Sequence, residues 1–106
     1  MLQPHPTVSV IVINYNGRQH LTTCFESLLA LDYPPDALEL ILADNASADD
    51  SVALVRRRFP SVRIIAHPQN YGFAGGNNRA AEQAGGRYIV FLNNDMRVQP
   101  DWLKSL

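Results

Sequence analysis

Polar residues follow three apolar segments of this sequence, and their types could bind a ligand. These polar segments are Asn14-Tyr15-Asn16-Gly17, Asp44-Asn45 and Asn93-Asn94-Asp95. The Asp44 carboxylate can accept hydrogen bonds from a base N–H or from sugar hydroxyls, and Tyr15 offers a flat surface for stacking. Asp95 supplies hard oxygen atoms, which Mg²⁺ or Mn²⁺ prefers when it bridges phosphates. Turn-forming residues are common after strands, so composition alone supports a binding site and ordinary turns about equally.

A glycine-rich segment leads into a predicted helix. Its residues are Asn70-Tyr71-Gly72-Phe73-Ala74-Gly75-Gly76-Asn77-Asn78. Free N–H groups at a helix start, together with the helix dipole, can hold an anion. The segment is not a dinucleotide-binding fingerprint, because it precedes the last predicted strand and lacks the G-x-G-x-x-G spacing. Helix capping and close packing of small residues are the alternative, which these residues alone slightly favour.

Other common site chemistries find no support in the sequence. His5, His20 and His67 lack the spacing of metal ligands, and no serine or cysteine is arranged with histidine as a nucleophilic site. Cys24 is the single cysteine, which excludes an internal disulfide, and we expect it to be a small buried apolar group. The run Arg56-Arg57-Arg58 falls at a predicted helix end, where cations oppose the helix dipole, so we interpret it as solvated.

Apolar strand-like segments alternate with helix-like segments along the chain. Strands are predicted for residues 8–13, 38–43, 62–66 and 88–92. Helices are predicted for residues 18–31, for a segment that carries Val52, Val55 and Phe59 and stops at Pro60, for residues 73–85, and for residues 101–106 after Pro100. We expect Ser47 or Asn45 to cap the second helix and Gly85-Gly86 to close the third.

This order predicts an α/β domain with an open, mainly parallel sheet and helices on both faces. Ligands of such sheets bind outside the carboxyl ends of the strands, so the three polar segments should meet at one rim. We expect residues 1–106 to form a single domain. Trp102 and Leu103 give the last helix an apolar face without a later partner. We therefore expect the N-terminal part of a longer protein, and a homodimer that covers this face.

Composition and charge limit the classes of partner. The 106 residues carry 9 basic and 10 acidic side chains, a formal net charge of -1. That balance gives no basic face, so we expect no nucleic-acid binding. The apolar segments are far shorter than the ~20 residues of a membrane helix, and the N-terminus lacks a signal-peptide pattern. The lone cysteine fits a reducing compartment, so we expect a cytoplasmic protein, either free or peripheral at the inner face of the cell membrane.

Four segments in order resemble glycosyltransferase family 2, across nearly the whole chain. They are Val8 to Asn16, Leu40-Ile41-Leu42-Ala43-Asp44-Asn45-Ala46-Ser47, Asn70 to Asn77, and Phe91-Leu92-Asn93-Asn94-Asp95. The pattern is most similar to the bacterial branch of rhamnosyltransferases and related cell-surface polysaccharide enzymes. The resemblance implies the Rossmann-like nucleotide-binding half of an inverting GT-A type transferase, which moves a sugar from a nucleotide-diphosphate donor to a hydroxyl of a saccharide or lipid-linked acceptor.

The resemblance also implies roles for individual residues. Asn93-Asn94-Asp95 occupies the D-x-D type motif of the family, so Asp95 would be the ligand of a divalent cation, Mn²⁺ or Mg²⁺. Asp44 and its neighbour Asn45 would contact the base or ribose. The nucleoside pocket would be lined by Asn14, Tyr15 and Asn16, and the donor flanked by the loop with Gly72, Gly75 and Asn77. Asn93 departs from the usual aspartate and supplies no charge, which leaves strict metal dependence open.

The catalytic base is not visible in this sequence. Inversion requires a base that takes the proton of the acceptor hydroxyl, and the family's base is an acidic residue in the later half of the domain. No residue here matches that motif, so we expect the base beyond Leu106 and expect this part alone to be inactive. A non-catalytic nucleotide-binding or regulatory module on the same fold is the alternative. A flavodoxin-like or receiver-type domain is disfavoured, because Asn14-Tyr15-Asn16 provides neither an acidic cluster nor a phosphate loop.

Overall fold

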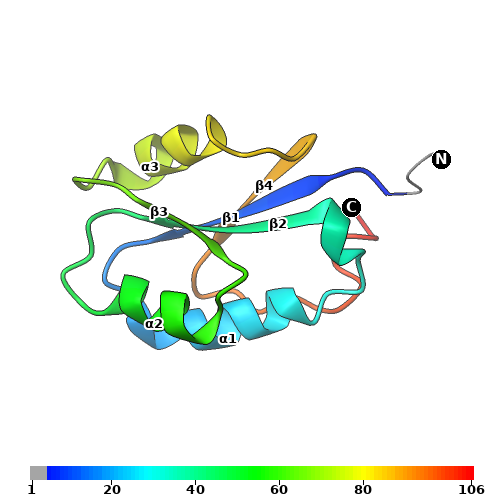
Figure 1. Cartoon of the computed structure of the whole chain (residues 1–106), viewed down its shortest axis with the longest axis horizontal. Coiled ribbons are helices and arrows are strands. Elements are labelled where there is room, and N and C mark those ends of the chain that lie inside the picture. The colour runs from blue at the N-terminus through cyan, green and yellow to red at the C-terminus, as the bar shows by residue number, and fades with distance from the viewer. Residues whose placement is uncertain (1–4) are drawn as a thin grey trace.

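The computed structural model describes residues 5–106 and contains a four-stranded parallel sheet (Figure 1). Its strands are β1 (Val8–Asn14), β2 (Leu38–Asp44), β3 (Arg63–Ala66) and β4 (Tyr88–Asn93), in the spatial order β3-β2-β1-β4. Each predicted strand is present, and all three pairings are parallel. The predicted open α/β sheet is therefore confirmed.

Helices cover both faces of the sheet. Helices α1 (Arg18–Leu29) and α2 (Ser51–Arg58) lie on one face and α3 (Gly72–Ala81) lies on the other, while the short 3₁₀ helix η1 (Pro35–Ala37) leads into β2 (Figure 1). Because β1 is covered on both sides, all seven of its residues are buried, which explains its almost continuous apolar sequence. None of the helices among the described residues is long and apolar enough to cross a membrane.

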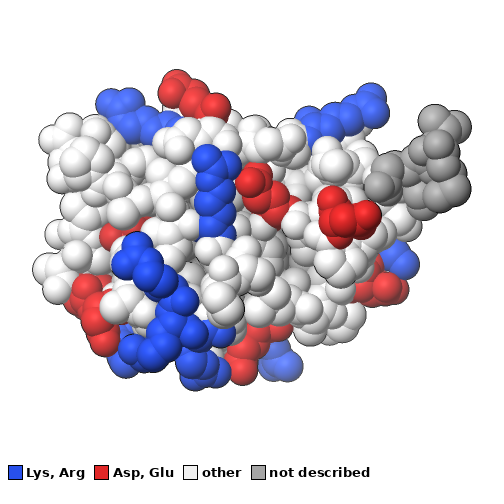
Figure 2. All heavy atoms as spheres, in the orientation of Figure 1, with Lys and Arg blue, Asp and Glu red and all other residues white. Residues whose placement is uncertain are grey.

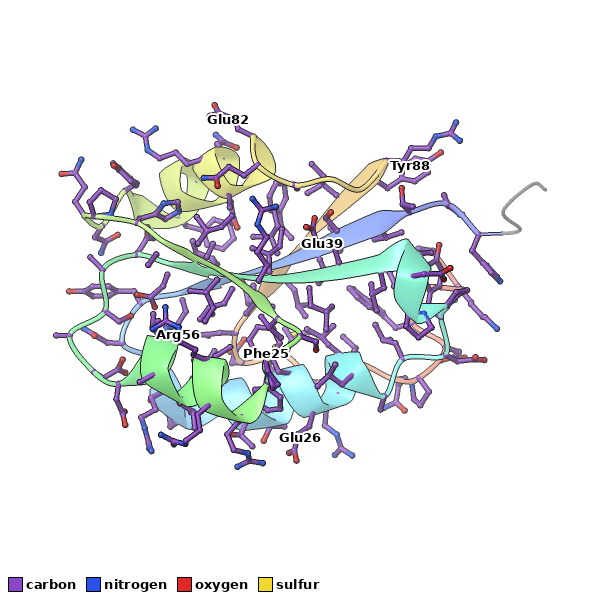
Figure 3. The ribbon with its side chains drawn as sticks, viewed as in Figure 1. Phe25, Glu26, Glu39, Arg56, Glu82 and Tyr88 are labelled. Atoms are coloured by element: carbon purple, nitrogen blue, oxygen red, sulfur yellow. The ribbon has the colours of Figure 1, made fainter. Side chains whose placement is uncertain are left out.

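The alternation of side chains along β1 supplies two separate cores. Val8, Val10 and Val12 pack with α1 residues such as Phe25, which points from the helix towards the sheet (Figure 3). Ile11 and Ile13 face the opposite way and belong to the smaller cluster that includes Ala80 of α3. The small side chains of α3 allow this helix to lie close to the sheet.

The arginine run takes the position expected of it. Arg56, Arg57 and Arg58 form the last turn of α2, and all three are exposed. Figure 2 shows basic residues gathered over the part of the surface where α2 lies, with acidic residues between and beside them. Arg58 lies 3.9 Å from Glu26 of α1, and both side chains are half exposed or more. The interpretation as a solvated helix end is consistent with this environment.

The start of α2 differs from expectation. Neither Ser47 nor Asn45 caps this helix, which begins at Ser51 without a side-chain cap. Ser47 instead turns back, and its backbone N–H donates to Asp44 Oδ2 at 2.9 Å. The nearby strand end competes for the serine more effectively than the helix does, because serine readily bonds local backbone and side-chain groups.

The last predicted helix is absent. Residues 100–105 form turns, since six residues are too few to offset the cost of starting a helix without further support. Leu103 is buried in the core beside α1 and α2, and Trp102 packs against the same cluster. The expected partnerless apolar face is therefore wrong, and the argument for a homodimer loses its basis. The third helix also ends earlier, at Ala81, and tighter turns continue from it to Ala84.

Candidate nucleotide-binding site

A cavity of about 400 Å³ opens at the carboxyl ends of β1, β2 and β4, beside the start of α3. It is lined by Ile13, Asn14, Tyr15, Asn45, Asn70, Gly72, Phe73, Asn93, Asn94 and Asp95. Strand pairing produces this convergence, because Asn14 is in register with Asp44, and Ile13 with Asn93. The rim predicted from the parallel sheet is therefore the place where the candidate residues gather.

Most of the expected site residues line this cavity, and four do not. Those in the lining are Asn14, Tyr15, Asn45, Gly72, Asn93, Asn94 and Asp95. Those outside it are Asn16, Asp44, Gly75 and Asn77. The surroundings of these four residues show which structural contacts they make.

Asp44 is held by protein groups at the end of β2. The residue is 2% exposed. Its Oδ1 accepts hydrogen bonds from Asn14 Nδ2 at 2.9 Å and from Ser47 Oγ at 2.7 Å, and its Oδ2 accepts the bond from the Ser47 N–H. The carboxylate thus closes the turn after β2 and fixes Asn14 of the neighbouring strand. A direct contact of Asp44 with a base or ribose stays a prediction.

Asn16 organises the loop after β2 from the loop after β1. Its backbone is left-handed, with φ of 51°, a conformation that asparagine tolerates better than most residues. Its Oδ1 accepts a hydrogen bond from the Ala48 N–H at 2.7 Å, and its own N–H donates to Ser47 Oγ at 2.8 Å. The side chain is therefore committed to joining two rim loops.

Asn45 fixes the start of α3. Its Nδ2 donates to the Gly72 carbonyl at 3.0 Å, and its Oδ1 accepts from the Tyr71 N–H at 3.3 Å. Gly76 lies against the same amide, and a Cβ there would be 2.7 Å from Asn45 Oδ1. Both ends of this buried amide therefore hold backbone of the glycine-rich loop.

The glycine-rich segment combines a local turn with helix packing. The N–H of Gly72 donates to Asn70 Oδ1 at 2.8 Å, which closes a turn just before α3, and the helix itself has no side-chain cap. Gly75 lies within α3, where a Cβ would meet Tyr71 Cβ at 3.1 Å. Asn77 is 3% exposed, and its Oδ1 has no partner among the described residues. The small-residue packing interpretation therefore accounts for much of this segment.

Two exposed aromatic side chains flank the cavity. Tyr15 is 54% exposed and Phe73 is 60% exposed, although both belong to its lining. Aromatic rings with such exposure offer stacking surface to a planar ligand. Phe73 and Asn70 belong to the expected glycine-rich segment without having been singled out in it, and Ile13 was not expected at the site. The aromatic residue inside the glycine-rich segment was the available signal for Phe73, whereas Ile13 looked like any strand residue.

Among residues 5–106, Asp95 is the acidic side chain of the cavity lining, and no lysine or arginine lines the cavity. Within the described residues no cluster of three or more histidine, cysteine, aspartate or glutamate side chains could hold a metal. A site with one carboxylate still suits Mg²⁺ or Mn²⁺, which commonly bind one or two carboxylates and complete their shell with water and phosphate. The amide oxygens of Asn93 and Asn94 are hard donors of the same kind, so the donor set fits such a cation.

The negative charge of Asp95 also affects the pKa of Cys24, which lies in α1. Cys24 is buried in α1, and burial raises the pKa of its thiol to about 12, with the negative charge of Asp95 as a second cause. Cys24 is therefore a neutral thiol at physiological pH, as the expected apolar role requires.

Comparison with known proteins identifies the relatives of this arrangement. The sequence model of glycosyl transferase family 2 matches residues 9–106. A β-1,3-glucosyltransferase of Escherichia coli, WfaP, whose name gives UDP-Glc as donor and α-D-GlcNAc-diphosphoundecaprenol as acceptor, is 38% identical over 90 residues, which cover 83% of this chain and 35% of WfaP.

Two solved structures share the fold. TarS of Staphylococcus aureus, residues 1–349 in complex with UDP-GlcNAc, has a TM-score of 0.84 and 28% identity, over 93% of this chain and 29% of that one. The mannosyltransferase PcManGT of Pyrobaculum calidifontis, in complex with GDP-Man and Mn²⁺, has a TM-score of 0.83 and 29% identity, over 92% of this chain and 32% of that one. The chain thus spans about a third of the length of most of these relatives.

Proposed function

Because this chain belongs to glycosyl transferase family 2, we propose that its cavity binds the nucleotide diphosphate of an activated sugar. The observation that carries the proposal is the composition of the cavity lining. It combines two exposed aromatic rings, several amides and one carboxylate at the carboxyl rim of a parallel sheet. Rings suit a base, amides suit sugar and phosphate oxygens or hydroxyls, and the carboxylate suits a cation.

The charge of the cavity argues for a divalent cation. A nucleoside diphosphate is strongly anionic, yet the lining offers it no lysine or arginine and places Asp95 nearby. A cation held by Asp95, with the oxygens of Asn93 and Asn94 close to it, would neutralise the diphosphate and stabilise it as a leaving group. PcManGT was solved with GDP-Man and Mn²⁺, which supports this assignment.

The same proposal includes the reaction of the whole protein. We expect it to transfer a sugar, with inversion, to a hydroxyl of a saccharide or lipid-linked acceptor in cell-surface polysaccharide synthesis, at the cytoplasmic face of the membrane. The donor and acceptor in the name of WfaP support this class of reaction. Our proposal assigns donor binding to residues 14–95 and places the catalytic base outside this chain.

Calorimetric titration with UDP, dTDP and GDP, each with and without Mn²⁺, tests the proposal. We expect one nucleotide to bind, and Mn²⁺ to strengthen that binding by about tenfold or more, since a charge-assisted contact is lost without it. Absence of binding to all three would contradict the proposal. Equal affinity for the bare nucleotide and for its sugar conjugate would favour the non-catalytic module instead.

A further inference from the structure

Asn14 connects Asp44 to the turn that carries Asp95, and its amide has one allowed orientation. The residue is 1% exposed and ends β1. Its Nδ2 donates to Asp44 Oδ1 at 2.9 Å. A carboxylate only accepts hydrogen bonds, so Asn14 must turn its NH₂ group towards Asp44 and its carbonyl oxygen away from it.

The orientation of Asn14 determines the orientation of Asn94. Asn14 Oδ1 accepts a hydrogen bond from Asn94 Nδ2 at 2.8 Å. A carbonyl oxygen also only accepts, so Asn94 must present its NH₂ group to Asn14, and Asn94 Oδ1 is turned away from this contact. Asn94 lines the cavity next to Asp95, and its Oδ1 has no hydrogen-bond partner within residues 5–106. We call the hydrogen-bonded side chains of Asp44, Asn14 and Asn94 the amide series. Their fixed orientations leave the Asn94 carbonyl oxygen available as an acceptor at the cavity.

Gly17 supplies an independent sign that this contact matters. A Cβ at this position would lie 2.2 Å from Asn94 Nδ2 and 2.6 Å from Asn14 Oδ1, the two atoms of the hydrogen bond. The backbone of Gly17 has φ of -109°, which any residue can adopt. Glycine is therefore required here because a side chain would occupy the space of the Asn14–Asn94 hydrogen bond, and not because of the backbone conformation.

We propose that Asn14 is a positioning residue, which orients the Asn94 amide and the turn Asn93-Asn94-Asp95 for a cation-bound diphosphate. Asp44 acts in the same series by fixing Asn14. The identity of the ligand at this turn rests on the proposed function, whereas the positioning by Asn14 follows from the hydrogen bonds alone. The experiment therefore tests these two claims with separate measurements.

The first measurement uses NMR on the full-length protein without nucleotide. The probes are the Asn94 side-chain NH₂ resonances and hydrogen exchange of the Met96 N–H, which closes the turn by donating to the Asn93 carbonyl at 3.2 Å. Asn14→Asp places a second acceptor against Asp44, so we expect shifted Asn94 resonances and at least about tenfold faster Met96 exchange. Gly17→Ala, which displaces Asn94 directly, should do the same if the buried charge of Asn14→Asp prevents folding.

A charge-conserving exchange tests the direction of the series. Asn14→Asp combined with Asp44→Asn restores a donor facing an acceptor between β1 and β2, and still offers Asn94 an acceptor. We expect this pair to recover the Asn94 resonances and slow Met96 exchange. Ser9→Ala is the matched control, because it removes a buried hydroxyl that donates a partly buried hydrogen bond to Glu39 at 2.7 Å near the opposite end of β1. It should lower stability and leave both probes unchanged.

The second measurement is calorimetry of the same variants with UDP, dTDP and GDP and with Mn²⁺. We expect Asn14→Asp to weaken the Mn²⁺-dependent part of binding by about tenfold and the exchanged pair to regain part of it. Unchanged Asn94 and Met96 probes in both Asn14→Asp and Gly17→Ala, or a folded exchanged pair without recovery, would overturn the positioning role. A wild-type protein that binds no nucleotide would overturn the proposed function, while the NMR probes would still decide the amide series.

Discussion

Asp95 combines exposure to solvent with a place in the cavity lining, and this sets it apart from Asp44. Two acidic residues at one rim looked alike in the sequence. In the structure Asp44 is enclosed by Asn14 and Ser47, whereas Asp95 keeps its carboxylate at the surface. The two residues should consequently respond differently to substitution.

Removal of the Asp95 carboxylate should affect the cation and leave the fold intact. We expect Asp95→Ala to abolish the Mn²⁺-dependent part of nucleoside diphosphate binding, with a change in unfolding free energy within about 0.5 kcal/mol, as is usual for exposed side chains. Calorimetry with and without Mn²⁺, together with thermal unfolding, measures both. Asp101→Ala, an exposed acidic residue outside the lining, is the matched control. Retention of full Mn²⁺ dependence in Asp95→Ala would remove Asp95 from the cation site.

Removal of the Asp44 carboxylate should instead destabilise the protein. Asp44→Ala leaves the N–H and the hydroxyl of Ser47 without their acceptor, and leaves Asn14 Nδ2 with only its longer bond of 3.3 Å to Ser47 Oγ. Unpaired buried donors cost roughly 1–3 kcal/mol each. We expect a loss of about 2–4 kcal/mol in urea unfolding, and weaker nucleotide binding with or without Mn²⁺. A loss of binding without any loss of stability would show that Asp44 contacts the nucleoside directly.

Residue types at the rim were predictable, and their hydrogen bonds were not. The parallel sheet requires that the segments after β1, β2 and β4 converge, and the apolar runs reveal those strands. The donor and acceptor directions of Asn14 and Asn45 depend on partners 30 and 27 positions away, which no local pattern records. Sequence reasoning therefore identified most of the residues that line the cavity, but it did not reveal that several of the expected side chains hold the loops.

At the scale of elements, the contact between α3 and the sheet depends on one position without a side chain. A Cβ at Gly76 would lie 2.6 Å from Ile13 Cδ1 and within 2.8 Å of both polar atoms of the Asn45 amide. The Gly76 carbonyl also lies 3.0 Å from Nε2 of His67, which is buried beside the helix. Close approach of α3 therefore sets where the glycine-rich loop meets the cavity.

Gly76→Ala should push α3 away from β1 and β2. Overpacking of this kind costs typically 1–3 kcal/mol, and we expect about 2 kcal/mol in urea unfolding together with weaker nucleotide binding. Gly85→Ala is a suitable control, since its Cβ would have only an ordinary contact of 3.8 Å with Glu39 Oε1. Equal stability of the two variants would mean that α3 can shift at no cost.

Glu39 holds the segment that follows α3 to the sheet. Burial opposes ionisation of this carboxyl, but hydrogen bonds from the Gly85 N–H, Ser9 and Arg63, and the Arg63 charge, outweigh burial and lower the pKa of Glu39. Figure 3 shows Glu39 on the sheet, below the turn that leads from α3 to β4. A lowered pKa means that the ionised form stabilises the folded state.

The stabilisation by Glu39 should be complete above its ordinary pKa of 4.5 and be lost as the pH falls through the lower pKa of the folded protein. We therefore expect Glu39→Gln to lose about 1–2 kcal/mol at pH 7 and much less at pH 3, by urea unfolding. Glu82→Gln, an exposed residue on the same side of the sheet (Figure 3), should change little at either pH. A deficit of equal size at both pH values would contradict the ionic role.

At the scale of the whole molecule, β4 is an edge strand with one uncovered face. Ile89 and Phe91 alternate with the more buried Val90 and Leu92, and they are in register with Ser9 and Ile11 of β1, on the side of α3. Phe91 is 46% exposed, while Leu92 is buried in the core beside α1. The position of this edge, next to Asn93 and Asp95, puts it directly beside the cavity.

The alternation along β4 predicts that substitutions at two adjacent positions destabilise the fold to different extents. In the chain of residues 1–106, Leu92→Ala should cost about 2–4 kcal/mol in urea unfolding, because it opens a cavity in the core. Phe91→Ala should cost less than about 1 kcal/mol, because much of its ring is already in water. The reverse order would show that the register of β4 is shifted by one residue.

The turns at residues 100–105 show where sequence reasoning about the whole molecule was limited. An apolar pair after Pro100 fits the start of a helix as well as it fits a turn. The local pattern could not reveal that Leu103 packs in the core. This segment is also held by the Asp32 N–H, which donates to the Pro100 carbonyl at 2.8 Å across a long sequence separation. Such long-range contacts determine the conformation of residues 100–105, whereas the order of strands and helices along the chain could be predicted from the alternation of segments.

Paramagnetic broadening by Mn²⁺ tests the central claim most directly, because it locates the ion within the fold. The full-length protein would be saturated with whichever of UDP, dTDP or GDP binds, and its amide spectrum recorded with Mg²⁺ and then with Mn²⁺. We predict that the signals of Tyr15, Gly72 and Asn94 disappear with Mn²⁺, while those of Thr7 and Gly85 at the other end of the sheet remain. Broadening centred away from the rim formed by β1, β2 and β4, or no broadening, would contradict a cation-assisted nucleotide site at this cavity.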